Sequence, residues 1–247
     1  MRFAPIVIIG SSRSGTTLLA KILTENGIFF GADVESNHES RSLQAVNRWI
    51  LLNASAGLEQ PERVDRLLAD PFLRQVAREA VFQYTVARHS AAFWGESVGD
   101  RHSARWGFKD PRTTFTLPIW MDVFPYAKVI HIQRNGQAVA RSLSVRRDRA
   151  MQAWDGDVAR RIAQHRAAAN LEVQDLAGGV DLWARYCARA HAHVMALGRQ
   201  ATTIHFEQLV DHPTVVLDRL GAFLDMDLVL GGDRPGRLPA GPRLTNI

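Results

Sequence analysis

Small residues, hydroxyl groups and one arginine are concentrated in a short stretch near the start of the chain. This stretch consists of Gly10, Ser11, Ser12, Arg13, Ser14, Gly15, Thr16 and Thr17. Small residues let the backbone curl so that its amide N–H groups point at an anion, and hydroxyl groups add further donors. A helix that starts directly after such a turn adds partial positive charge at the same place. We therefore predict a phosphate-binding loop here, with a capped glycine-serine turn as the simpler alternative.

The residue after the second glycine distinguishes this loop from the loop of nucleoside triphosphatases. Four residues lie between Gly10 and Gly15, as in a Walker A loop, but Thr16 stands where that loop has its lysine. The positive charge lies instead at Arg13, inside the loop. This pattern disfavours triphosphate hydrolysis and indicates a nucleotide whose 5′ end carries one phosphate and one transferable group.

Apolar runs and helical periodicity alternate along the chain, which predicts an α/β fold with a central parallel sheet flanked by helices. The expected strands are residues 4–9, 106–108, 127–133 and 201–206. The expected helices are 16–26, 39–54, 61–89, a helix after Pro111, 137–149, 157–175, 180–198 and 213–225. The loop then lies between the first strand and its helix, in one domain that spans residues 1–247. Residues 231–247 are expected to form a loop or a lid-like tail.

The sequence Arg13-Ser14-Gly15-Thr16-Thr17 resembles the 5′-phosphosulfate loop of sulfotransferases that use 3′-phosphoadenosine-5′-phosphosulfate (PAPS). The same family has an arginine at a strand end and a serine eight residues later, which bind the 3′-phosphate. Arg134 and Ser142 match that pattern after the expected strand 127–133. The resemblance implies a P-loop sulfotransferase fold, PAPS as co-substrate and PAP as product. A surface arginine and an unrelated helix serine would be the alternative for this pair.

Two further segments support the resemblance, and three positions depart from it. Residues 108–112 resemble the Lys-Asp-Pro element of tyrosylprotein and related sulfotransferases, and residues 205–213 resemble their Tyr-Glu-Gln-Leu segment. The family tyrosine is Phe206 here, and the tryptophan that many cytosolic members carry after the loop is Leu18. The segment that begins with Lys109 has no catalytic histidine. The base must therefore come from another segment.

The resemblance also suggests which residues act on the transferring sulfonate. Arg13 and Lys109 are the expected charged groups, and a glutamate after the loop helix is the expected base. Glu39 is the first candidate, and Glu35 and His38 are alternatives. A structural explanation of this acidic cluster is a helix cap at Ser36 or Asn37, with Glu39 completing a capping box.

Composition limits the remaining classes of function. The net charge is +5, only Lys21, Lys109 and Lys128 are lysines, and the basic residues are scattered, so we expect no nucleic-acid partner. Cys187 is the single cysteine, and no Cys/His cluster has the spacing of a zinc site, so we expect no disulfide and no metal. No run approaches the roughly 18 apolar residues of a membrane span, and we expect a cytoplasmic protein.

The acceptor leaves no motif in the sequence. We expect a hydroxyl or amine on a glycan, a glycolipid or a small metabolite, bound between the helical segments 39–89 and 150–198. Two alternatives of another class stay open. One is a P-loop kinase of a small metabolite, and the other is a non-catalytic protein that binds polyanions.

Overall fold

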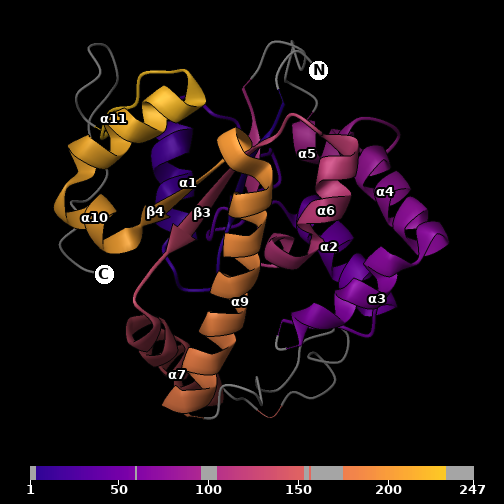
Figure 1. Cartoon of the computed structure of the whole chain (residues 1–247), viewed down its shortest axis with the longest axis horizontal. Coiled ribbons are helices and arrows are strands. Elements are labelled where there is room, and N and C mark those ends of the chain that lie inside the picture. Colours follow the sequence, from indigo (N-terminus) through magenta and orange to yellow (C-terminus); the bar gives the residue numbers. More distant parts are fainter. Residues whose placement is uncertain (1–3, 59, 96–104, 153–155, 157–174, 232–247) are drawn as a thin grey trace.

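A computed structural model of the protein describes residues 4–58, 60–95, 105–152, 156 and 175–231 (Figure 1). Four strands form one parallel sheet in the order β2-β1-β3-β4. Their bounds are β1 (Ile6–Ile9), β2 (Gly107–Lys109), β3 (Lys128–Gln133) and β4 (Ala201–His205). The predicted α/β fold with a central parallel sheet flanked by helices is confirmed.

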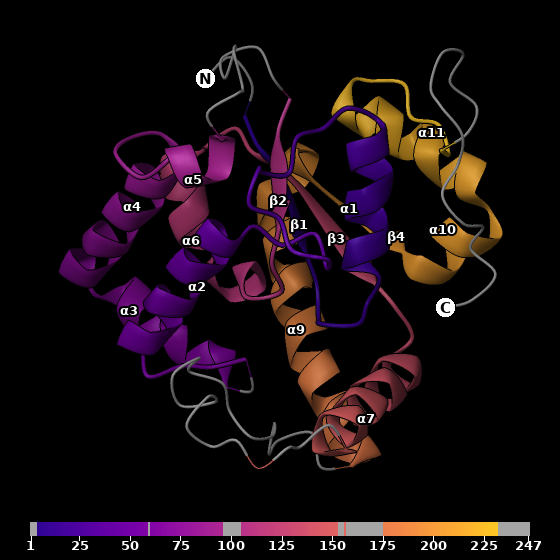
Figure 2. The same cartoon turned by 180° about the vertical axis from the view of Figure 1, so that it is seen from behind.

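All four residues of β1 are buried, because helices cover both faces of the sheet. Side chains alternate between the two faces along a strand. Ile6 and Ile8 pack into a core with α1 (Thr16–Glu25) and α11 (Pro213–Leu224). Val7 and Ile9 pack into a second core with α2 (Arg41–Asn53), α6 (Thr113–Val123) and α9 (Leu176–Leu197). Figures 1 and 2 show α1 and α11 on one side of the molecule and α2 and α6 on the other.

The carboxyl ends of the parallel strands meet at one edge of the sheet, and this edge positions the candidate site. The loop from Gly10 follows β1, Lys109 is the last residue of β2, and Arg134 follows β3. β1 lies between β2 and β3, so the loop lies between Lys109 and Arg134. Ligands of open α/β sheets bind at this edge of the sheet.

The predicted helix over residues 61–89 is wrong as one element. The structure divides it into a short 3₁₀-helix, η1 (Pro61–Arg63), then α3 (Val64–Ala69) and α4 (Pro71–Thr85). Pro71 has no N–H and restricts the residue before it, so the chain breaks there. Asp70 then caps α4 by accepting a hydrogen bond from the Leu73 amide at 2.9 Å. The one-turn helix α5 (Ala91–Trp94) was not predicted.

Several other element boundaries differ from those predicted. The helix expected over 137–149 is α7 (Gly136–Gln152), and the Asn135 side chain accepts a hydrogen bond from the Ala138 amide at 3.1 Å. The last strand ends at His205, because Phe206 starts the unpredicted helix α10 (Phe206–Asp211). The helix expected over 180–198 begins earlier, at Leu176, and ends before η2 (Gly198–Gln200).

Two expected segments lie mostly outside the described part of the chain. These are residues 157–174 of the helix expected over 157–175 and residues 232–247 of the expected tail. Of the residues that the structure describes, none belongs to a helix long and apolar enough to cross a membrane.

Candidate functional site

The loop between β1 and α1 requires glycine at both ends. Gly10 has φ 143°, Gly15 has φ 99°, and Arg13 between them has φ 70°. A Cβ at Gly10 would lie 2.6 Å from the Ile132 carbonyl oxygen, and a Cβ at Gly15 would lie 2.2 Å from Cδ2 of Phe206. Both the backbone angles and the close neighbours therefore exclude a side chain at these two positions.

Hydrogen bonds within and behind the loop hold it in this shape. The Ser14 hydroxyl donates to the Ser11 carbonyl at 2.7 Å, and the Gly10 amide donates to Oγ1 of Thr114 at 3.0 Å. The Ser11 Oγ is buried and has no partner among the described residues. The Gly15 position caps α1 without any side-chain hydrogen bond. The first-turn amides of α1 and the Ser11 hydroxyl are therefore donors that fit an anion in the loop.

Arg13, Arg134 and Ser142 are close together at this loop. Nε of Arg13 donates to Oγ of Ser142 at 2.8 Å, across 129 positions of sequence. Nη1 of Arg134 donates to the Arg13 carbonyl at 3.2 Å, and its guanidinium lies 4.4 Å from the centre of the Phe206 ring. Phe206 therefore packs between the loop glycine and Arg134, where the family has a tyrosine.

Positive charge accumulates around Arg13. Partial burial lowers the pKa of Arg13, and the charges of Arg146, Arg134 and Arg149 lower it further. Arginine stays protonated in proteins, so these guanidinium groups repel one another. An anion bound among them would relieve that repulsion.

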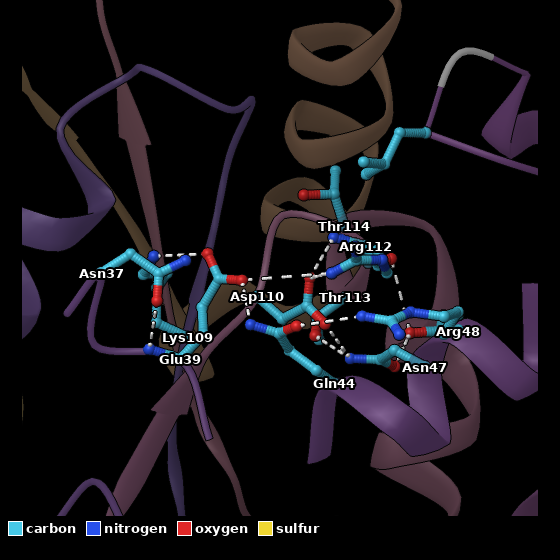
Figure 3. Close-up of polar contacts among 12 residues, drawn as sticks. Asn37, Glu39, Gln44, Asn47, Arg48, Lys109, Asp110, Arg112, Thr113 and Thr114 are labelled. Carbon is cyan, nitrogen blue, oxygen red and sulfur yellow. Dashed lines mark hydrogen bonds and ion pairs between the residues drawn. The ribbon is translucent and has the colours of Figure 1, made fainter. Parts of the chain in front are cut away.

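Lys109 and Glu39 form a buried ion pair beside the first turn of α1 (Figure 3). Nζ of Lys109 lies 2.6 Å from Oε1 of Glu39 and donates to Oγ1 of Thr17 at 3.3 Å. Lys109 is 3% exposed and Glu39 is 8% exposed, so water screens this pair little. The proposed cation and the first candidate base are therefore in direct contact.

Burial shifts both groups of this pair toward their neutral forms. The pKa of Glu39 is raised, first by burial and then by the Asp110 carboxylate, while Lys109 and Arg112 oppose the rise. The pKa of Lys109 is lowered by burial, and Glu39 opposes that change. A carboxylate with a raised pKa is a stronger base than one at the surface, which suits proton removal near neutral pH.

The capping explanation of the acidic cluster is wrong. The cap of α2 is Ser40, whose hydroxyl accepts from the Leu43 amide at 3.3 Å, so Glu39 precedes the helix. Asn37 accepts instead from the Glu39 amide at 3.2 Å, within a turn. The Glu35 amide donates to the Glu39 carbonyl at 2.9 Å, which closes this turn.

The two alternative bases are placed differently from Glu39. Glu35 forms a more exposed ion pair with Arg41, where the Nε–Oε1 distance is 3.4 Å. His38 has φ 57°, and its Nδ1 is buried without a partner among the described residues. Its pKa is lowered by burial first and then by the charges of Lys21 and Lys109. Of the three candidates, Glu39 alone contacts, among the described residues, a cation that also bonds to the loop helix.

Sequence reasoning missed the residues that support this pair. Asp110 is 1% exposed and accepts at 2.9 Å from both the backbone amide and Nη1 of Arg112. Asn47 donates to the other Asp110 oxygen at 3.0 Å. Asp110 thus directs Arg112 toward Glu39, whose Oε2 lies 4.0 Å from Nη1. The only sign of this role of Asp110 in the sequence was its position next to Lys109 in the segment 108–112.

Within the part of the chain that the structure describes, no group of three or more His, Cys, Asp or Glu side chains is arranged to hold a metal ion. The site instead contains arginine, lysine, backbone amides and hydroxyl groups. These groups can bind and neutralise an anion by themselves.

Comparison with known proteins gives a consistent picture. A family model described as "Sulfotransferase family" matches residues 5–229. The sulfotransferase domain of the Synechococcus PCC 7002 olefin synthase has a TM-score of 0.51 and 19% identity, over 91% of this chain and 74% of that chain. Sulfotransferase STF1 from Mycobacterium tuberculosis H37Rv has a TM-score of 0.50 and 15% identity, over 93% of this chain and 69% of that chain. No curated protein matches the sequence. At these identities the solved structures show a shared fold.

Proposed function

We propose that this chain, which belongs to the sulfotransferase family, transfers a sulfonate group from PAPS to a hydroxyl or amine acceptor. Membership of the family supports a transferase and disfavours the two alternatives, a metabolite kinase and a polyanion-binding protein. PAPS as donor, the acceptor class and the roles of individual residues are our proposal. A cytoplasmic location and a single domain over residues 1–247 stay predictions.

The observation that supports PAPS most directly is the meeting of Arg13, Arg134 and Ser142 at the phosphate loop. PAPS has anionic groups at its 5′ and 3′ positions, so a protein that binds it needs two neighbouring anion sites. The loop amides, Ser11, Ser12, Ser14, Gly15, Thr16, Thr17 and Arg13 would hold the 5′-phosphosulfate. Arg134 and Ser142 would hold the 3′-phosphate, because a strand-end arginine and a helix hydroxyl can share one phosphate.

The transfer step follows from the positions of Glu39 and Lys109. The acceptor oxygen or nitrogen attacks sulfur in line with the bond to the 5′-phosphate, and that sulfur–oxygen bond breaks as the new bond forms. The electron pair of the broken bond stays on the phosphate of PAP. The acceptor proton goes to the Glu39 carboxylate. Lys109 and Arg13 balance the negative charge that grows on the leaving phosphate.

Glu39 is the proposed base in preference to Glu35 and His38. Its carboxylate is buried, has a raised pKa and touches the lysine that also contacts Thr17 of the loop helix. Proton removal and charge neutralisation would then occur side by side. Glu35 stays the second candidate for the base.

The acceptor is proposed to bind beside α2, on the Glu39 side of the site. The helical segment 39–89 and the described part of 150–198 would form its pocket. A glycan, a glycolipid or a small metabolite fits the proposal equally. Labelled PAPS with a panel of such acceptors tests the class of activity directly.

A binding experiment tests the donor without knowledge of the acceptor. PAP at 100 times its Kd should stabilise the native state by about 2.7 kcal/mol. For a chain of this size that corresponds to a Tm rise of roughly 5–11 °C, with no metal added. ATP–Mg²⁺ at the same concentration should give a much smaller rise. Equal rises for both nucleotides would overturn the proposed 3′-phosphate site.

A further inference from the structure

We propose that Gln44 is a positioning residue that keeps the Glu39 carboxylate ionised and in place, and that Arg48 orients the Gln44 amide for this role. This inference rests on the proposed function of Glu39 as the base. Neither residue matches a motif, and neither forms a hydrogen bond or ion pair with the described residues of the phosphate loop. Both lie on α2, one helical turn apart.

The first step is the contact between Gln44 and Glu39. Gln44 lies in the first turn of α2 and is 7% exposed. Its Nε2 donates to Oε2 of Glu39 at 2.7 Å, while Lys109 donates to Oε1 at 2.6 Å (Figure 3). Each oxygen of the carboxylate therefore has its own donor, which holds the group in one plane and one rotamer. A base that is held in this way needs less reorganisation when it accepts a proton.

The second step concerns the orientation of the amide, which has one donor end and one acceptor end. Nη2 of Arg48 donates to Oε1 of Gln44 at 3.3 Å (Figure 3). A guanidinium can only donate, so it requires the amide oxygen on its side. The amide nitrogen must then face Glu39. Among the described residues, Arg48 has no carboxylate within ion-pair distance, and its guanidinium bonds to the Gln44 amide instead.

The third step is the charge around Glu39. The charged groups that face it are Lys109, Arg112, Asp110 and, beyond the Gln44 amide, Glu35. The Gln44 Nε2 lies 3.5 Å from Oε2 of Glu35, so the amide stands between two carboxylates. A hydrogen bond to an ionised carboxylate favours the ionised form. Gln44 therefore opposes the rise in pKa that burial and Asp110 cause, and it keeps Glu39 able to accept a proton.

The chain offers matched variants that separate this role from a structural one. Gln44→Met removes the amide and keeps the length of the side chain. On α4, the exposed Gln75 accepts from Nη1 of Arg78 at 3.3 Å, the same pairing far from the site. Gln75→Met and Arg78→Met are therefore the controls for Gln44→Met and for the variants of Arg48.

The first measurement is the pKa of the Glu39 side chain in the whole chain, with no ligand. Protein labelled with ¹³C at glutamate carboxyl carbons is titrated by NMR, and Glu39→Gln identifies the signal. In Gln44→Met the pKa should rise by about one to two units. A smaller rise is expected in Arg48→Met, and no change in Arg48→Lys, which keeps a donor, or in the two controls. An unchanged pKa in Gln44→Met overturns the inference.

Arg48→Met also covers the case in which Gln44→Met fails to fold. Arg48 is exposed, so its loss leaves the core intact. If Arg48→Met folds and its Glu39 titrates as in the wild type, Arg48 does not orient the amide and the proposed link fails. A Glu39 pKa that is higher in Arg48→Met but unchanged in Arg48→Lys supports the proposed link.

The second measurement is turnover of PAPS with water as the acceptor, followed as labelled sulfate. In Gln44→Met the acid limb of the pH profile of kcat should move to higher pH by the same amount as the Glu39 pKa. The KM for PAPS should change by less than about twofold. If Gln44→Met shifts the Glu39 pKa but the wild-type protein transfers no sulfonate to water or to any acceptor of the panel, the proposed function fails and Gln44 remains the residue that holds Glu39. Turnover whose acid limb does not move in Gln44→Met would refute the inference alone.

Discussion

Replacing Lys109 by methionine tests the buried ion pair most sharply. Methionine keeps the unbranched stem of lysine and removes its charge. The Glu39 carboxylate would then lie buried beside the Asp110 carboxylate, with only the Gln44 amide in contact and Arg112 at 4.0 Å. The variant should therefore be less stable than the wild type whenever Glu39 is ionised.

The expected loss follows from the burial of the two partners. Exposed ion pairs contribute about 0–1 kcal/mol, whereas removing one partner of a buried pair costs about 3–5 kcal/mol. Exposures of 3% for Lys109 and 8% for Glu39 put this pair in the second class. Gln44 and Arg112 compensate in part, so we expect a loss of about 3 kcal/mol in the free energy of unfolding. For a chain of this size that is a Tm decrease of roughly 6–12 °C.

The loss should depend on pH in a definite direction. Glu39 already has a raised pKa in the folded state, and loss of Lys109 raises it further. A carboxyl group with a raised folded pKa contributes stability that is fully present below its unfolded pKa, about 4.3 for glutamate. That stability is lost as the pH rises through the folded pKa. The difference between variant and wild type should therefore be small near the unfolded pKa and largest in alkaline solution.

Urea unfolding in acidic and alkaline buffers measures both effects. The double variant Lys109→Met/Glu39→Gln removes both charges, and it should regain most of the lost stability at alkaline pH. Lys21→Met, at an exposed position of α1, is the control and should change stability by less than about 0.5 kcal/mol. A loss at Lys109 below about 1 kcal/mol that is equal at both pH values would refute the burial argument.

Four further substitutions should change ligand binding, turnover or stability. Arg134→Ala should weaken PAP binding by about one to two decades and leave binding of adenosine 5′-phosphosulfate almost unaffected, because only PAP has the 3′-phosphate. Calorimetry with both ligands measures this. Equal losses for both ligands would show that Arg134 stabilises the fold and does not bind the 3′-phosphate. Ser142→Ala should do the same in part, although its loss also frees Arg13. Glu39→Gln should lower turnover of labelled PAPS by roughly 10²–10⁴-fold with little change in PAP affinity, whereas a larger loss in Glu35→Gln would transfer the role of base. Gly15→Ala would place Cβ 2.2 Å from a phenylalanine ring of α10, so PAP binding and Tm should both fall, and a normal PAP affinity would contradict the loop geometry.

Local patterns in the sequence were sufficient for the fold class and for the glycine turn between β1 and α1. An apolar run such as residues 6–9 must be buried on both faces, and glycines at 10 and 15 permit backbone angles that other residues avoid. Pro71 carried a local signal as well, and its effect on residues 61–89 was underestimated. These features depend on neighbours in the chain, so they can be predicted without the tertiary structure.

Only the tertiary structure decided which polar side chains meet. Arg13 and Ser142 were matched to two separate family motifs, but their 2.8 Å contact spans 129 positions and depends on how α7 leaves β3. The pair of Lys109 and Glu39 spans 70 positions, and Gln44 joins it because Ser40, rather than Ser36 or Asn37, caps α2. No periodicity or spacing encodes such contacts, since they arise where separate strands and helices pack against one another. The charge and pKa of the proposed base therefore depend on packing that the sequence alone does not reveal.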